Sequence, residues 1–336
     1  MRIALDAMGG DHGPPPNIAG ALVALQAAPD LTVVLVGDQS ILESLLSKSD
    51  VSLSDRLQIV HCTQSIGMDE KPSDALRKKP DNSISRCWQL VAEKNVDGLV
   101  SAGNTGAVVA GGLFTRRFLK GVRRPGIAAV MPTARGQCVI MDVGANVFPK
   151  PSHLLQYGVM GWMYAKHMLN IENPSIGLIN VGEEEGKGHE LVQQTWELFR
   201  TSPLSVHFAG NIEGRDIHSG KVDVVVTDGF VGNVILKLSQ GVFEFTMGVI
   251  GKELNATLDT EKDAALKVVK NIAQRFHYSS VGGAPLLGVD GVCIIAHGSS
   301  NDRAIANALN VAAQNVRVKL NDKIIEQLAT LPASDE

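Results

Sequence analysis

A charged, glycine-rich loop is the first stretch of this sequence whose residue types suggest chemistry. LINVGEEEGKGHEL, residues 178–191, joins an apolar run to a helical pattern and carries Glu183, Glu184 and Glu185 beside Lys187. A lysine near a helix start adds a full positive charge where backbone N–H groups already favour an anion, and nearby carboxylates keep it protonated. The loop therefore predicts an anion site at Lys187, and the alternative is a solvated charged loop.

Two glycine-rich loops, DAMGGDHGP and SAGNTGA, also follow apolar runs and end where helical patterns begin. Glycines let the backbone approach a ligand closely, and the free N–H groups of a helix start favour an anion. SAGNTGA therefore predicts a phosphate cradle, although it matches neither G-x-G-x-x-G nor G-x-x-x-x-G-K-[ST], and a tight strand-to-helix turn gives the same pattern. The candidate binding residues of the two loops are Asp6, Gly9, Gly10, Asp11, Ser101, Gly103, Asn104, Thr105 and Gly106.

Two further loops add polar side chains at expected strand ends. TDGFVGNV supplies Asp228, Gly229 and Asn233, and AHGSSNDRA supplies His297 followed by two serines. Serines at a helix start commonly serve as N-caps. His297 has no Ser/Asp relay near it in sequence, so we do not expect a serine-protease-like triad.

The elements that must position these loops alternate between strands and helices. Short β-branched runs end in glycine, asparagine or aspartate and then pass into helical patterns, which predicts a mostly parallel sheet covered on both faces. In such sheets, ligands bind beyond the carboxyl ends of the strands. GIAAVMPT and QCVIMDVG lie too close together for a helical crossover and predict an antiparallel pair.

Three helices can be placed from the pattern. The first starts at Pro151 and is apolar on most faces, which predicts burial. The other two cover residues 231–256 and 261–277, joined around NATLDT, and form an apolar hairpin with basic edges. We expect one domain over residues 1–336, with the hairpin at 231–280 serving a dimer contact and possible membrane association. The predicted membrane-facing residues are Leu254, Leu258, Leu266 and Val269.

Composition limits the classes of protein that fit. The 336 residues are 44% apolar and carry a net charge of −4, which argues against a general nucleic-acid binder. The four cysteines lie far apart, which favours a reducing cytosol over a disulfide framework or a zinc site. From the N-terminus MRIALDAMGG we expect no signal peptide, and we expect no membrane span because no run approaches the roughly 18 apolar residues required.

Taken in order, six motifs resemble the bacterial PlsX family, the acyl-ACP:phosphate acyltransferases, over nearly the whole chain. They are DAMGGDHGP, SAGNTGA, DVGANV, NVGEEEGKG, DGFVGNV and GGAPLLGVDGVCIIAHGSS. The resemblance implies a three-layer α/β/α, Rossmann-like fold related to phosphotransacetylases and to isocitrate and isopropylmalate dehydrogenases. It also implies a homodimer that makes acyl phosphate from inorganic phosphate and acyl carrier protein thioesters, without a metal or redox cofactor.

The implied reaction needs donors and one cation, because phosphate is already a nucleophile and the enzyme must stabilise an oxyanion. We expect Lys187 and the Asn104 loop to hold phosphate, and Asn233 or His297 to polarise the thioester carbonyl. Phe148 and Val281 depart from the small acidic residue and the aromatic expected at their positions. The remaining candidate binding residues are Asp142, Asn146, Asn180, Glu183, Glu184, Asp228 and Gly229.

Partners follow from the same resemblance and from charge. The segment TRRFLKGVRRPG gathers Arg116, Arg117, Lys120, Arg123 and Arg124 and is a candidate docking site for the acidic carrier protein, or only a solvated helix end. The product implies a downstream acyl-phosphate-using glycerol-3-phosphate acyltransferase in phospholipid (phosphatidic acid) synthesis. The expected location is the cytoplasm, peripherally at the inner face of the cell membrane.

Three alternatives remain at this point. A phosphotransacetylase-like enzyme would use CoA as the acyl carrier, and a decarboxylating NAD-dependent dehydrogenase would share the fold. Against the dehydrogenase, no clear arginine triad or metal-binding aspartate set stands out. A third class is a non-catalytic membrane scaffold for lipid enzymes.

Overall fold

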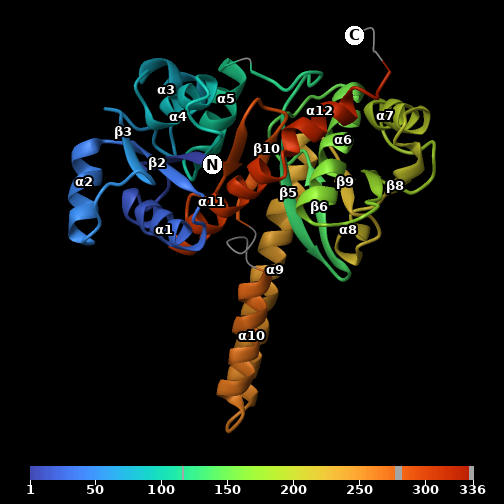
Figure 1. Cartoon of the computed structure of the whole chain (residues 1–336). Helices are drawn as coiled ribbons and strands as arrows, with labels where there is room; N and C mark the ends of the chain where they lie inside the picture. Colours follow the sequence, from blue (N-terminus) through green and yellow to red (C-terminus); the bar gives the residue numbers. More distant parts are fainter. Residues whose placement is uncertain (116, 277–281, 333–336) are drawn as a thin grey trace.

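An eleven-stranded sheet forms the middle layer of the protein, whose computed structural model describes residues 1–115, 117–276 and 282–332 (Figure 1). Its strand order is β3-β2-β1-β4-β11-β10-β5-β6-β9-β7-β8. The strands are β1 (Arg2–Asp6), β2 (Thr32–Gly37), β3 (Leu57–His61), β4 (Gly98–Ser101), β5 (Gly126–Thr133), β6 (Gly136–Met141), β7 (Ile176–Ile179), β8 (Phe208–Ile212), β9 (Val224–Val226), β10 (Ala284–Leu287) and β11 (Val292–Ile295). The predicted mostly parallel sheet is confirmed.

The sheet consists of two parallel groups joined by antiparallel strands. The first group is β3, β2, β1, β4 and β11, and the second is β6, β9, β7 and β8. Strand β10 is antiparallel to both β11 and β5, and β5 is antiparallel to β6, so the predicted β5–β6 pair is confirmed. Strands β8 and β10 were not predicted, because FAGNI and APLL are short and interrupted by glycine or proline.

The two groups run in opposite directions along the sheet, and the twist decides where their carboxyl ends meet. Neighbouring strands rotate by about 20–25°, which accumulates to roughly 100° over the five pairings from β4 to β9. Two directions that are opposite in a flat sheet therefore differ by only about 80° in the twisted one. The carboxyl ends of both groups can face one shared cleft, which a flat drawing of the topology does not reveal.

Helices cover both faces of the sheet and complete the predicted three layers (Figure 1). Alternate residues of β5 show the division, since Ala129 and Met131 join one apolar cluster and Ala128 and Val130 join another. On the first face lie α3 (Pro72–Lys78), α4 (Ser83–Ala92), α5 (Thr105–Thr115), α8 (Asp216–Ser219) and the start of α9 (Gly229–Thr257). On the other lie α1 (Pro14–Ala27), α2 (Gln39–Lys48), α6 (Pro151–Met168), α7 (Glu190–Thr201), α11 (Asp302–Arg317) and α12 (Leu320–Leu328), with the short 3-10 helix η1 (Ser205–His207) near α7.

Helix α6 is buried, as its apolar faces predicted. Pro151 occupies its first turn, where a missing N–H costs no helical hydrogen bond. Tyr157 and Met160 are fully buried in the core of the second group.

Helices α9 and α10 (Lys262–Phe276) form the predicted hairpin, which protrudes from the body of the protein (Figure 1). The only buried residues of α9 are Gly229 and Gly232, near its start. The expectation that no run approaches a membrane span is wrong, because α9 is long and apolar enough to cross one by length and composition, with a mean hydropathy of 1.3. Its few charged residues are spread along 29 positions. The predicted hairpin residues 277–280 lie outside the described residues, as does Val281.

Candidate active site

A cavity of about 1350 Å³ lies against the first face of the sheet, and loops from both strand groups line it. Asp11, Thr105 and His297 come from loops that follow strands of the first group. Asn233 comes from the start of α9, which follows β9 of the second group. The floor is apolar and includes alternate residues of β5. The cleft expected from the sheet twist is therefore present, and four of the predicted site residues line it.

The first-group loops are packed backbone against backbone. The N–H of Asp11 donates to the Gly298 carbonyl at 2.8 Å, and the N–H of Ala296 donates to the Ser101 carbonyl at 2.8 Å. Gly9 touches the backbone of Gly103 so closely that a β-carbon would collide with it. Three loops far apart in sequence thus form one rigid wall, and glycine is required at their contact.

Asp6 lies beneath this wall and ties two of its loops together. Its carboxylate accepts hydrogen bonds from Ser101 Oγ at 2.6 Å and from the Met8 N–H at 3.3 Å. Burial raises the pKa of the Asp6 carboxyl above its usual value of 3.8, although these hydrogen bonds oppose the shift. Asp6 is 1% exposed. The structure therefore places Asp6 as a support for the loops, away from the cavity surface.

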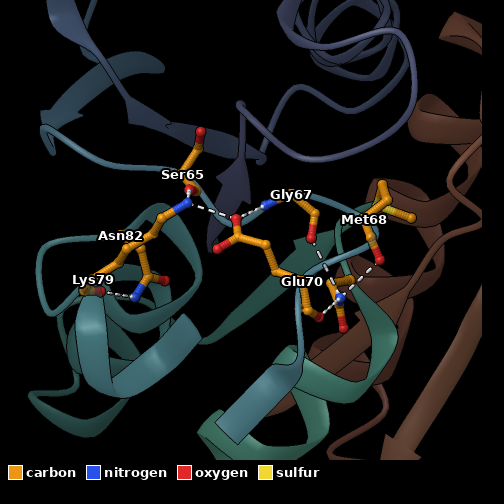
Figure 2. A network of polar contacts seen from close by, with 7 residues as sticks. Ser65, Gly67, Met68, Glu70, Lys79 and Asn82 are labelled. Carbon is orange, nitrogen blue, oxygen red and sulfur yellow. Dashed lines mark hydrogen bonds and ion pairs between the residues drawn. The ribbon is translucent and has the colours of Figure 1, made fainter. Parts of the chain in front are cut away.

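The Asn104 side chain makes hydrogen bonds within the protein. Its Nδ2 donates to the carbonyls of Met68 and Glu70 at 3.0 and 2.9 Å, and its Oδ1 accepts from the N–H of Ala107 at 3.0 Å. The loop it grips is held from the other side by Lys79, which pairs with the Glu70 carboxylate (Figure 2). Asn104 caps α5 and fixes the 65–70 loop over the cavity. Its predicted contact with phosphate stays a prediction.

Thr105 and His297 present donors to the cavity. Thr105 is the first residue of α5, and its exposed side chain lines the cavity beside the helix start. Ser299 donates its backbone N–H to Nδ1 of His297 at 3.2 Å, so a neutral His297 ring carries its proton on Nε2. Asn301, rather than Ser299 or Ser300, caps α11 by accepting from Ala304 at 2.9 Å. The two serines therefore do not serve as the N-cap considered from sequence.

Asp142 plays the supporting role in the second group. It is fully buried and accepts hydrogen bonds from the backbone N–H groups of Ile127, Gly144, Ala145 and Asn146 at 2.7–3.1 Å. Burial raises the pKa of this carboxyl, and the hydrogen bonds oppose the rise. The loop after β6 is thus wound around one carboxylate, as the loop after β1 is.

The start of α9 is packed onto that loop. The Gly229 N–H donates to the Asn146 carbonyl at 2.8 Å, and a β-carbon on Gly229 would collide with Asp142. Asp228 is the N-cap of α9 and accepts from the N–H of Phe230 at 2.9 Å. These contacts set the first turn of α9 and bring Asn233 to the cavity wall.

The loop around Lys187 lies one strand further out, between β7 and α7. Asn180 Nδ2 donates to the Lys187 carbonyl at 3.0 Å, and Gly188 has a φ of +88° that suits glycine. Glu183 pairs with Lys221 at 2.8 Å, whereas the Lys187 ammonium has no ion pair with any residue that the structure describes. Asn180, Glu183, Glu184 and Lys187 are outside the set of described residues that line the cavity.

A serine–histidine pair in the cavity wall was not predicted. His218 Nδ1 lies 3.0 Å from the Pro132 carbonyl, which accepts, so Nε2 of the neutral ring accepts from Ser239 Oγ at 3.0 Å. These distances suit a nucleophile and its base. Ser239, however, lies in the middle of α9, where backbone N–H groups are used within the helix and cannot form an oxyanion hole. The pair holds α9 against the end of β5.

Sequence reasoning missed Met68, the β5 floor and the α9 wall of the cavity. Met68 contacts Gly298 across the cavity rim, and its loop resembles an ordinary polar connection in sequence. Strand β5 was predicted, but periodicity alone does not say what covers its face. Among the described residues, no group of three or more metal-binding side chains occurs.

Comparison with known protein sequences gives a consistent result over nearly the full chain. Residues 1–323 match a family model described as "Fatty acid synthesis protein". A phosphate acyltransferase from Geobacter sulfurreducens is 42% identical over 332 residues, covering 98% of this chain and 95% of that protein. A phosphate acyltransferase from Heliobacterium modesticaldum is 46% identical over 319 residues, covering 94% of each.

Two solved enzyme structures share this fold. A phosphotransacetylase from Streptococcus pyogenes superposes with a TM-score of 0.64 at 17% identity, over 94% of each chain. A branched-chain phosphotransacylase from Enterococcus faecalis gives a TM-score of 0.57 at 14% identity, over 94% of this chain and 99% of that one. At these identities the likeness concerns the fold, and the predicted phosphotransacetylase-like α/β/α architecture is confirmed.

Proposed function

The chain belongs to the PlsX family of phosphate acyltransferases, and we propose that it transfers an acyl group from acyl carrier protein to inorganic phosphate. A phosphate oxygen attacks the thioester carbonyl, the C–O bond forms, the C–S bond breaks, and the thiolate leaves with the carrier. The products are acyl phosphate and free carrier. The single observation that carries this proposal is the cavity, which combines a helix start, a histidine donor and an apolar floor.

The cavity supplies what a direct attack by phosphate requires. Phosphate is held at the start of α5, where the backbone around Thr105 offers free N–H groups to an anion. We assign to Lys187, on the exposed loop after β7, the neutralisation of the phosphate charge, although this loop lies outside the described lining of the cavity. His297, through its Nε2–H, or Asn233 polarises the carbonyl and stabilises the oxyanion. No covalent enzyme intermediate is needed, because the nucleophile is the substrate itself.

The remaining predicted residues act around this centre. We assign Asp6 and Asp142 to holding the loops, since both are buried and saturated with donors. Around these two carboxylates lie the candidates Gly9, Gly10, Asp11, Ser101, Gly103, Gly106, Asn146, Asp228 and Gly229, whereas Asn180, Glu183 and Glu184 belong to the Lys187 loop after β7.

The carrier decides between this proposal and its runner-up, a phosphotransacetylase-like enzyme that uses CoA. Acyl-phosphate formation from matched acyl-ACP and acyl-CoA donors, measured side by side, separates the two. We expect kcat/KM to be at least about tenfold higher with acyl-ACP, a difference of about 1.4 kcal/mol. A higher value with CoA would favour the runner-up. If the folded protein turns over neither donor, the remaining alternative is a non-catalytic membrane scaffold for lipid enzymes.

A homodimer is supported by an exposed apolar stripe along α9, of which Leu238 and Val242 also border the cavity. Phe230, Val234, Leu238, Val242 and Phe245 recur every three or four residues and are 49–72% exposed. A stripe of this length on one helix face is typical of a buried helix contact. We propose that it packs against the same stripe of a second copy, which a Phe245→Glu variant should convert to monomers in sedimentation analysis. A dimer that persists in that variant would place the interface elsewhere.

Peripheral membrane contact is the remaining proposal for the hairpin. The predicted anchors Leu254, Leu258, Leu266 and Val269 are half-buried, because they lie where α9 and α10 pack together. More exposed apolar side chains on α10 are Val268 and Ile272. We propose that the hairpin rests on the inner face of the cell membrane, where acyl phosphate passes to a glycerol-3-phosphate acyltransferase for phosphatidic acid synthesis. Loss of sedimentation with anionic vesicles in a Val268→Glu, Ile272→Glu variant would support this, and unchanged sedimentation would oppose it.

A further inference from the structure

The cavity extends well beyond the space that phosphate and a thioester group occupy. Its volume of about 1350 Å³ exceeds the roughly 300–1,000 Å³ typical of pockets for small ligands. A phosphate ion needs only the polar rim near Thr105 and His297. The rest of the space must hold a second, larger part of a substrate or remain filled with water.

The floor of this space is apolar and is buried in the protein. Ile127, Ala129 and Met131 point to the same face of β5 and are 4–6% exposed, although all three line the cavity. Leu236 and Phe243 of α9 stand opposite as a half-buried wall. Water against such surfaces gains few hydrogen bonds, so an apolar ligand is favoured by about fourfold in affinity for each methylene buried.

The length of the floor fits one extended hydrocarbon chain. Strand β5 contributes residues from Ile127 to Thr133, which span about 20 Å at the usual rise per residue. One layer of lipid chains fills about 15 Å, half of a bilayer's hydrocarbon core. The floor therefore accommodates a chain of membrane-lipid length beside the polar rim.

We propose that the acyl chain of the donor lies between β5 and α9, and that Ala129 and Phe243 set the chain length that the enzyme accepts. This inference rests on the proposed acyl transfer. Ala129 is the smallest side chain in the middle of the floor, so enlarging it shortens the usable space. Phe243 fills the wall toward the hairpin, so removing its ring lengthens that space.

Chain-length selectivity tests the proposal. The kcat/KM for phosphate-dependent consumption is measured with octanoyl, dodecanoyl and hexadecanoyl donors. Ala129→Leu should lower the hexadecanoyl-to-octanoyl ratio by about tenfold or more, and Phe243→Ala should raise it severalfold. Phe114→Ala is the matched control, because Phe114 is an exposed ring near the end of α5 and is outside the cavity-lining set of described residues. It should leave the ratio unchanged.

A binding measurement separates this proposal from the reaction. The affinity of each variant for cis-parinaric acid, a fluorescent fatty acid, is measured without phosphate or carrier. Weaker binding by Ala129→Leu but not by Phe114→Ala supports the chain site, even if no donor is turned over and the proposed function fails. Equal selectivity and equal fatty-acid affinity in all variants would overturn it. If Ala129→Leu does not fold, as judged by circular dichroism, the comparison of Phe243→Ala with Phe114→Ala decides.

Discussion

The loops that line the cavity and the loop around Lys187 differ in how they are held. The cavity loops pack backbone against backbone and are anchored by the buried carboxylates of Asp6 and Asp142. The Lys187 loop is exposed, and its carbonyls accept hydrogen bonds from the side chains of Asn180, Gln193 and Asn211, while Glu183 pairs with Lys221. The loop with the most charge in the sequence is thus held by exposed or partly buried side chains, without a buried carboxylate at its centre. A dense run of charges marks a surface, whereas strand order and twist determine where loops meet.

This contrast suggests a division of labour. The rigid wall fixes the positions of donors that must meet an oxyanion, since small displacements there cost rate. The exposed loop contributes a point charge on the flexible four-carbon stem of a lysine, which can adjust its position toward an anion. The following predictions test whether the two regions differ in this way.

The largest effect is expected at the rigid wall. His297→Ala should lower kcat by about 100- to 1,000-fold with little change in the KM for phosphate, because one preorganised oxyanion donor is lost. Steady-state kinetics with acyl-ACP and phosphate measure this. His189→Ala is a suitable control, because His189 makes no side-chain capping bond at the start of α7. A His297→Ala enzyme with near wild-type kcat would remove His297 from the chemistry.

A large but different effect is expected at the exposed loop. Lys187→Ala should lower kcat/KM for phosphate by about 100-fold without changing the fold, since a full charge on the anion is lost. Lys187→Arg should restore little, because a forked guanidinium does not replace a point charge. Phosphate titrations against a Lys48→Ala control make the comparison. Unaltered kinetics in Lys187→Ala would favour the alternative interpretation, in which the loop is a solvated charged surface.

A smaller effect is expected in the basic segment after α5. Arg117 and Arg124 are described, and Arg116 lies outside the described residues. Arg123 and Arg124 precede Pro125, whose carbonyl accepts from Asn146 Nδ2 at 2.6 Å, so the segment borders the second-group loops. Arg117→Glu with Arg124→Glu should raise the KM for acyl-ACP severalfold and flatten its salt dependence. A KM that does not vary between about 50 and 300 mM salt in the wild type would exclude electrostatic docking.

The smallest effect concerns protein stability and tests the role of Asp6 as a support for the cavity loops. Because burial raises the pKa of Asp6 above 3.8, its contribution to the free energy of unfolding is fully present below that value and is lost as pH rises through the folded-state pKa. Relative to Asp6→Asn, the wild type should therefore lose stability as pH rises from acid toward neutral. Urea unfolding across this range measures the difference. A difference that grows with pH would mean that the carboxylate is stabilised when charged.

Much of the fold could be predicted because its signals are local. The strands that carry motifs, the β5–β6 pair, the buried α6 and the hairpin all follow from short patterns of apolar residues. The site was only partly predictable for the opposite reason. Asn104 is a residue type that can bind phosphate, but its side-chain amide donates to carbonyls of the 65–70 loop. No pattern in the sequence predicts that contact. Likewise, the floor residues of β5 line a cavity together with α9, which lies about a hundred residues further along the chain.

The central claim is that phosphate itself attacks the thioester of acyl carrier protein within this cavity. The most direct measurement follows thioester loss from dodecanoyl-ACP with and without inorganic phosphate, while acyl phosphate is trapped by hydroxylamine as the hydroxamate. We predict that the wild type consumes thioester only when phosphate is present, with one acyl phosphate formed per thioester lost, and that His297→Ala does so about 100- to 1,000-fold more slowly. Thioester loss at the same rate without phosphate, or none from the folded wild type, would contradict the account.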